Sequence, residues 1–253
     1  MESLKDNKSS SNSFPFLERF LSVTRSLVRL VYPDFCAGCN TLIETPGRYP
    51  ICQSCLSGIN YCEGPYACVP GEGNVSSYFS LGHYEGILRN LIVNFKYHNK
   101  INLVDFFADK LIERSSQKIF LSPFSESDLI IPVPLHFNKA KERGFNQAEL
   151  LGMALSRRTG IPMVCDAVIR HKETVPQNKL KIEERFSNLY GAFSLNRTKS
   201  SFLKNKNVII IDDVLTTGAT VENLARTIKL AGSSNIFAVT IAKTLLERVI
   251  PQK

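Results

Sequence analysis

The chain has 253 residues, which suits one domain with a small appendage or two domains. Hydrophobic residues make up 43% and charged residues 21% of the sequence, and this balance excludes a mostly disordered, collagen-like or integral membrane protein. The formal net charge is +8, and residues 139–206 alone hold 14 Lys and Arg against 6 Asp and Glu. That stretch is either an ordinary solvated surface or a surface that faces a polyanion such as pyrophosphate or nucleic acid.

The N-terminal segment predicts neither a leader peptide nor a membrane-spanning helix. Residues 1–13 are polar and are expected to form a disordered tail. They contain no apolar core followed by a cleavage site, and no later run approaches the roughly 20 apolar residues of a spanning helix. We therefore expect a cytoplasmic protein with no integral membrane span. Residues 14–31 have the spacing of an amphipathic helix, which docks on its own protein or lies on an anionic membrane.

Two C-x-x-C pairs follow, Cys36 with Cys39 and Cys52 with Cys55, separated by twelve residues. Each pair can bend so that its two thiolates face one centre, and two pairs together form the tetrahedral sulfur shell of a structural zinc site. A redox pair and unpaired structural cysteines are the alternatives. We predict that residues 14–70 contain the amphipathic helix and a small module that binds structural Zn²⁺.

The three remaining cysteines do not extend this pattern. Cys62 and Cys68 are spaced too widely for a third pair, and their role stays open. Cys165 has apolar neighbours and is expected to be buried.

Beyond a Pro- and Gly-containing linker at 70–74, strand and helix patterns alternate. Strands are expected at 77–84, 128–134, 207–211 and 235–242, and helices at 87–95, 101–112, 145–159 and 219–231. Strands that alternate with helices indicate a parallel sheet with helices on its faces. Residues 75–253 should therefore form an α/β domain.

The most informative stretch is residues 208–220, VIIIDDVLTTGAT. Its apolar strand ends in Asp212 and Asp213, at the edge where open parallel sheets bind ligands. The loop from Thr216 to Thr220 opens a helix, and its backbone N–H groups and hydroxyls can surround a phosphate. Because two carboxylates would repel that phosphate, they are expected to accept hydrogen bonds from sugar hydroxyls or to reach Mg²⁺. The pattern therefore predicts a site for a phosphorylated sugar.

This stretch resembles the phosphoribosyl-pyrophosphate (PRPP) signature of type I phosphoribosyltransferases. Together with the cysteine pairs and other blocks, the chain is similar to the ComF family of competence proteins over about residues 30–245. Those blocks are 84–89, 95–97, 131–134, 143–147, Arg170 with 176–177, and 184–188. The spacing of Cys62 and Cys68 departs from the family, where many members carry another C-x-x-C.

The resemblance implies a type I phosphoribosyltransferase-like parallel sheet flanked by helices, with a small N-terminal zinc-ribbon module. It implies Mg²⁺ together with PRPP as ligands. The residues that it assigns to PRPP are Asp212, Asp213, Thr216, Thr217, Gly218, Ala219 and Thr220. It places pyrophosphate on the loop at 134–144, with the cations Lys139, Lys141 and Arg143, and a lid at 170–181, with the cations Arg170 and Lys172. The zinc ligands are Cys36, Cys39, Cys52 and Cys55.

The functional hypothesis that follows is a PRPP-binding protein that acts on or with single-stranded DNA in natural transformation. A competence helicase or a recombination mediator is then a candidate partner. One alternative is a metabolic phosphoribosyltransferase that transfers ribose 5-phosphate from PRPP to a small base or amine. The other is a non-catalytic nucleic-acid-binding adaptor. No residue is plainly suited to activate a nucleophile, so the catalytic residues, the acceptor and turnover itself stay open.

Overall fold

The computed structural model describes residues 33–45, 47–62, 68–70, 73–116, 122–171 and 191–244. The expected tail and amphipathic helix, as well as the lid residues from Lys172 onward, lie outside these ranges. None of the described helices has the length and the apolar character that crossing a membrane requires.

The centre of the fold is a five-stranded sheet in the order β1-β2-β7-β6-β3. Its strands are β1 (Cys68–Pro70), β2 (Ser77–His83), β3 (Leu129–Pro132), β6 (Val208–Leu215) and β7 (Ile236–Lys243). Strands β2, β7, β6 and β3 run parallel, and β1 pairs with β2 in the antiparallel direction at the edge. The parallel sheet and its flanking helices confirm the α/β fold expected from the sequence. A separate two-stranded sheet joins β4 (Val168–Arg170) to β5 (Phe193–Leu195).

Strand β6 is longer than its apolar run predicts. The expected strand ends at Ile211, but Asp212 and Val214 stay in register with Thr240 and Ala242 of β7. The backbone ladder between β6 and β7 therefore continues past the last isoleucine. As a result, Asp212 and Asp213 lie within the strand, so their side chains project from a paired, rigid backbone.

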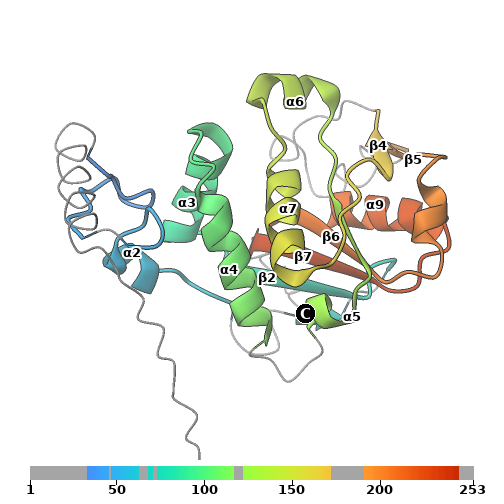
Figure 1. Ribbon diagram of the computed structural model, residues 1–253, viewed down its shortest axis with the longest axis horizontal. Coiled ribbons are helices and arrows are strands. Elements are labelled where there is room, and N and C mark those ends of the chain that lie inside the picture. Colours follow the sequence, from blue (N-terminus) through green and yellow to red (C-terminus); the bar gives the residue numbers. More distant parts are fainter. Residues whose placement is uncertain are drawn as a thin grey trace, which may run out of the picture.

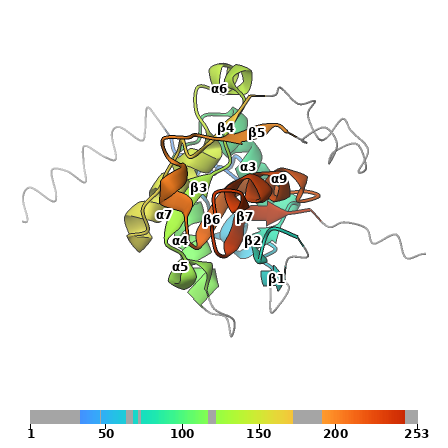
Figure 2. The same cartoon turned by 90° about the vertical axis from the view of Figure 1, so that its right-hand side faces the viewer.

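Helices cover both faces of the sheet (Figure 2). On one face lie α3 (Gly86–Tyr97), α4 (Leu103–Ser116) and α7 (Gln147–Thr159), while α9 (Ala219–Lys229) packs on the other. Short helices occur at α2 (Gln53–Ser57), α5 (Pro123–Glu126), α6 (Phe137–Arg143) and η3 (Ser200–Leu203). The expected 134–144 loop thus contains helix α6, which stands above the rest of the domain (Figure 1).

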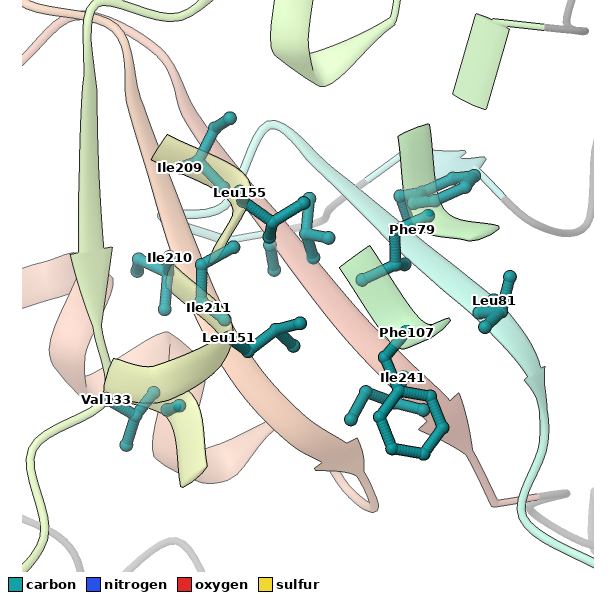
Figure 3. Close-up of a cluster of buried hydrophobic side chains, with 14 of the residues drawn as sticks. Phe79, Leu81, Phe107, Val133, Leu151, Leu155, Ile209, Ile210, Ile211 and Ile241 are labelled. Atoms are coloured by element: carbon teal, nitrogen blue, oxygen red, sulfur yellow. The ribbon is translucent and has the colours of Figure 1, made fainter. Parts of the chain in front are cut away.

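The hydrophobic core lies between the sheet and these helices. Val208, Ile209, Ile210 and Ile211 are fully buried, as expected for a parallel strand covered on both faces. Figure 3 shows side chains of α7 and α4 gathered with strand residues in one cluster, among them Leu151, Leu155, Phe107, Ile209, Ile211 and Ile241. This packing holds the carboxyl ends of the strands in fixed positions.

The N-terminal module docks on α3, which lies between α2 and α4 (Figure 1). Asn94 Nδ2 donates to the Ala37 carbonyl at 2.6 Å, and Asn90 Nδ2 donates to the Gly38 carbonyl at 3.3 Å. Gly38 is closely packed, because a Cβ there would lie 2.8 Å from Cys55 Sγ. Successive turns of α3 therefore hold the backbone of the first cysteine pair.

A carboxylate of α4 forms the second link between the module and the domain. Asp109 accepts a hydrogen bond of 2.7 Å from Tyr49 OH and pairs with Arg48 at 2.9 Å and with Arg158 of α7 at 2.6 Å. Burial opposes the charge, but the hydrogen bonds from Tyr49 and Arg158 lower the pKa of Asp109 below its usual range. Asp109 thus joins the module, α4 and α7 through one ionised side chain.

The depressed pKa of Asp109 predicts a pH-dependent contribution to stability. Asp109→Asn should lower the free energy of unfolding at pH 7 by about 2 kcal/mol, because hydrogen bonds to a charged group are lost. The stabilisation by Asp109 is present above the unfolded pKa of about 3.9 and is lost as the pH falls through the folded pKa. Urea unfolding of both proteins should therefore show a difference that narrows as the pH falls below about 4.

Asp105→Asn is the matched control, because Asp105 contacts the same Arg158 from a half-exposed position. Asp105→Asn should lower the free energy of unfolding much less than Asp109→Asn does. A difference between wild type and Asp109→Asn that stayed constant at every pH would show that the charge of Asp109 contributes nothing to stability.

Candidate functional site

A cavity of about 210 Å³ opens where β3 and β6 end. The polar residues of its lining come from α3, α6, β4, β6 and the start of α9. They are Lys96, Lys139, Arg143, Arg170, Asp212, Asp213, Thr216 and Thr220, with Gly218 at the same edge and Val133, Leu135, Val214, Leu215 and Val221 as the apolar part. The fold therefore brings two carboxylates, a helix-opening loop and four cations to one place.

Most of the residues proposed for the site from the sequence line this cavity, but not all of them. Thr217 and Ala219 are outside the lining: Thr217 Oγ1 accepts a hydrogen bond from Ala219 N at 3.4 Å, and Ala219 is fully buried. Lys141 is exposed on α6 and is not part of the lining. Lys172 lies outside the described residues. Thr217 and Ala219 thus shape the loop, while Lys141 faces solvent.

The loop between β6 and α9 has the geometry of an anion site. Gly218 lies directly before the helix with φ +78°, a backbone conformation that favours glycine. The first N–H groups of α9 have no partner within the helix, and they carry the positive end of its dipole. A phosphate can accept hydrogen bonds from these groups and from Thr216 and Thr220.

The two carboxylates differ in their surroundings. Asp213 Oδ2 forms an ion pair with Lys96 Nζ at 2.8 Å, and Asp212 Oδ1 accepts a hydrogen bond from Asp213 N at 2.8 Å. Burial, followed by repulsion from Asp213, raises the pKa of Asp212 to about 7. Asp212, with its raised pKa, can hydrogen-bond sugar hydroxyls beside the ion-paired Asp213 without repelling a nearby phosphate strongly.

Lys96 is the site residue that sequence reasoning missed. Burial alone would lower its pKa, but the Asp213 carboxylate raises that pKa above the usual range, so the ammonium stays charged. In the sequence, Lys96 is an ordinary cation in the last turn of a helix. Its one sequence signal is membership of the 95–97 block, which resembles the ComF family but implies no role for Lys96.

Asn146, in the block 143–147, has a structural role. Asn146 caps α7, since its Oδ1 accepts a hydrogen bond from Ala148 N at 3.1 Å. Cys62 is buried with its Sγ 3.8 Å from His83 Nε2, and Cys68 belongs to β1. Cys165 is exposed, so the prediction that it would be buried is wrong. Its neighbours Val164 and Asp166 lie in a surface segment and do not cover it.

The cysteine pairs converge as their spacing predicts. The Sγ atoms of Cys36, Cys39, Cys52 and Cys55 all lie within 4.8 Å of one another. Burial opposes the Cys36 thiolate, but backbone N–H groups that include Cys52 N, at 3.2 Å, lower its pKa. A hydrogen bond with Thr41 lowers the pKa of Cys39 to about 6.

Cys55 has the opposite tendency, because burial and its thiol neighbours raise its pKa. A divalent cation removes this penalty, since metal binding displaces the proton from a coordinating thiol. Four sulfur ligands with no open position match a closed structural zinc site. The cluster is therefore able to bind zinc.

Comparisons with known proteins agree with this geometry. Residues 146–249 match the model of the phosphoribosyl transferase domain family. Competence protein F of Haemophilus influenzae is 33% identical over 224 residues, which cover 84% of this chain and 91% of the relative. The DNA utilization protein YhgH of Shigella flexneri is 35% identical over 118 residues, which cover 47% of this chain and 50% of the relative.

Among solved structures, the purine phosphoribosyltransferase of Pyrococcus horikoshii is similar with a TM-score of 0.34 and 22% identity. That match covers 62% of this chain and 81% of that one.

The sheet, the helix-opening loop after two carboxylates and the matched domain define a protein with the type I phosphoribosyltransferase fold. Its N-terminal part carries a four-cysteine cluster that is compatible with a small zinc module. The chain belongs to the ComF family of competence proteins.

The cysteine cluster predicts about one zinc ion per chain in elemental analysis of the purified protein. Cys36→Ser should lose the ion and melt at a lower temperature, because the binding free energy of a structural metal contributes to folding. Cys165→Ser is the matched control, since Cys165 is exposed and lies outside the cluster, and it should keep its zinc. A wild-type protein without metal, with the four cysteines oxidised in pairs, would contradict the assignment.

Proposed function

We propose that this protein binds PRPP together with Mg²⁺ in the cavity, and that it acts on or with single-stranded DNA during DNA uptake. The observation that carries the proposal is the meeting of Asp212 and Asp213, the phosphate-type loop and the cations of α6 and β4 in one cavity. Each group suits one part of PRPP. The carboxylates suit the ribose hydroxyls, the loop suits the 5′-phosphate, and Lys139, Arg143 and Arg170 suit the pyrophosphate.

Mg²⁺ accompanies PRPP in this proposal, since a divalent cation neutralises part of the charge of a pyrophosphate group. Zn²⁺ has a separate, structural role in the cysteine cluster. Neither ion alone identifies an acceptor for the ribosyl group. Assay of pyrophosphate released from PRPP, with a panel of bases and amines, tests turnover and the metabolic alternative directly.

The DNA part of the proposal draws on the relatives and on helix α6. The relatives are named as competence and DNA utilization proteins. On α6, Phe137 is 74% exposed, and the exposed cation Lys141 lies one helical turn further along. An exposed aromatic ring among cations suits single-stranded nucleic acid, because bases stack on the ring while the backbone meets the charges.

Phe145 does not belong to this surface. Phe145 follows the α6 cation Arg143 closely in the sequence, but its ring packs against Phe95 with centroids 6.3 Å apart. Phe186, another phenylalanine of the basic stretch, lies outside the described residues.

The PRPP assignment predicts that Asp213→Ala lowers PRPP affinity about tenfold to a hundredfold in calorimetric titrations with Mg²⁺. The variant loses hydrogen bonds that involve a charged acceptor, which contribute roughly 1.5–3 kcal/mol each. Asp166→Ala, at an exposed position outside the cavity lining, is the matched control and should bind PRPP like wild type. Unchanged affinity in a folded Asp213→Ala variant would refute the assignment.

The DNA assignment predicts that fluorescence anisotropy detects binding of a labelled single-stranded oligonucleotide, with affinity that falls steeply with salt. The slope should be about 0.7 per phosphate contact. Replacing Lys139, Lys141 and Arg143 together by alanine should weaken binding and reduce the slope by about 2. PRPP should compete with the oligonucleotide, because Lys139 and Arg143 line the PRPP cavity.

A pair of phenylalanine variants separates stacking from charge. Phe137→Ala should weaken binding by roughly 1–3 kcal/mol without changing the salt slope. Phe202→Ala is the control, since Phe202 is also exposed, at 57%, but belongs to η3 and not to α6. This variant should bind the oligonucleotide like wild type. Absence of binding at low salt, or equal binding by wild type and the triple variant, would favour the metabolic phosphoribosyltransferase.

A further inference from the structure

Lys96 enters the cavity from a part of the chain that the matched phosphoribosyl transferase domain does not include. The match begins at residue 146, whereas Lys96 lies in the last turn of the core-facing helix α3. Its Nζ lies 2.8 Å from Asp213 Oδ2, and the two side chains are only 15% and 17% exposed. Lys96 thus joins Lys139 and Arg143 as a cavity cation that precedes the matched residues.

A buried ammonium group is costly unless it is paired, so the position of Lys96 depends on the carboxylates that face it. The Asp213 carboxylate is also unfavourable without a partner, because the buried carboxyl of Asp212 lies next to it and repels its charge. The ion pair offsets both penalties. It also engages one particular oxygen of Asp213, Oδ2, which restricts rotation of that carboxylate.

The backbone around Lys96 is held in place by the segment that carries the pyrophosphate cations. Gln147 Nε2 donates to the Lys96 carbonyl at 3.5 Å, and Arg143 Nη2 donates to Tyr97 OH at 3.1 Å. The Arg143 guanidinium also lies 5.0 Å from the centre of the Tyr97 ring and donates to Gln147 Oε1 at 3.1 Å. Lys96 consequently has little freedom to leave the cavity while the domain is folded.

We propose, on the basis of the proposed PRPP site, that Lys96 is a positioning residue for the ribose. By holding Oδ2 of Asp213, it keeps Oδ1 turned to the cavity as the acceptor for a ribose hydroxyl. Lys96 acts through Asp213 in this role and is not itself a ligand of the pyrophosphate. The sugar should therefore depend on Lys96 even when the ligand carries no pyrophosphate.

Two other roles for Lys96 make different predictions. A direct ligand of the pyrophosphate would matter for PRPP and inorganic pyrophosphate but not for ribose 5-phosphate. If the ion pair is purely structural, replacing Lys96 would change the stability of the protein. The affinities for all three ligands would then stay at their wild-type values. Affinities for these three ligands thus separate the roles.

The experiment is calorimetric titration of the full chain with PRPP, ribose 5-phosphate and inorganic pyrophosphate, each with Mg²⁺. Lys96→Met removes the charge and keeps the length of the side chain, and Lys96→Arg keeps the charge. Lys139→Met is the matched comparison, because Lys139 reaches the cavity from α6. Circular dichroism and melting curves establish that each variant is folded, and Lys96→Gln replaces Lys96→Met if that variant does not fold.

For Lys96→Met we expect affinity for both PRPP and ribose 5-phosphate to fall about tenfold, the effect of one lost charge-assisted interaction. Pyrophosphate affinity should stay close to that of wild type, because the charge of Lys96 is already balanced by Asp213. Lys96→Arg should restore most of the ribose 5-phosphate affinity. Lys139→Met should show the opposite pattern: it should lose more affinity for PRPP and pyrophosphate than for ribose 5-phosphate.

Loss of pyrophosphate affinity with unchanged ribose 5-phosphate affinity in Lys96→Met would overturn the proposal and make Lys96 a direct ligand. Wild-type affinity of folded Lys96→Met for all three ligands would also overturn it and leave a structural pair. Failure of the wild-type protein to bind PRPP or ribose 5-phosphate is a different result, since it would overturn the proposed function and this inference with it.

Discussion

Helix α3 is buried on one side in the core and contacts both candidate ligand sites with its remaining surface. Leu88, Leu91, Ile92 and Phe95 are fully buried, and each such side chain contributes about 1.5–3 kcal/mol when it leaves water. This burial fixes the rotation of the helix. With the rotation fixed, Asn94 meets the backbone of the first cysteine pair and Lys96 meets Asp213. Both contacts would be lost together if α3 turned by one residue, which rotates a helix by about 100°.

The cysteine module also depends on the domain for its stability. The module has few apolar residues of its own, so it needs a metal ion or a neighbouring surface to become stable. The structure shows the neighbouring surface: α3 holds the backbone of the first cysteine pair, and Asp109 binds Tyr49 and Arg48. The thiol cluster is therefore packed against the domain, and contacts that involve no metal hold its cysteines in place.

The cations of residues 139–206 lie in three kinds of place: in the cavity, in ion pairs and on the surface. Lys139, Arg143 and Arg170 line the cavity, whereas Arg158 pairs with Asp105 and Asp109. Other cations of the stretch lie on the surface, such as Lys141. The two interpretations of this charge, an anion-facing surface and an ordinary solvated surface, thus apply to different residues of the same stretch. Inside the cavity, four cations meet two carboxylates, Asp212 and Asp213, and Asp213 pairs with one of those cations, Lys96.

The sequence alone determined the α/β fold, the two cysteine pairs and the stretch with Asp212, Asp213 and the loop at 216–220. These features are local, because strand and helix periodicity, the C-x-x-C spacing and a strand–loop–helix motif are each complete within a short segment. Tertiary structure alone decided which cations face the carboxylates. Lys96 and Asp213 are more than a hundred residues apart, and no local pattern relates them. They meet because the core packs α3 against β2 and β7, the strand that pairs with β6, and burial of an ammonium group requires a carboxylate at that point.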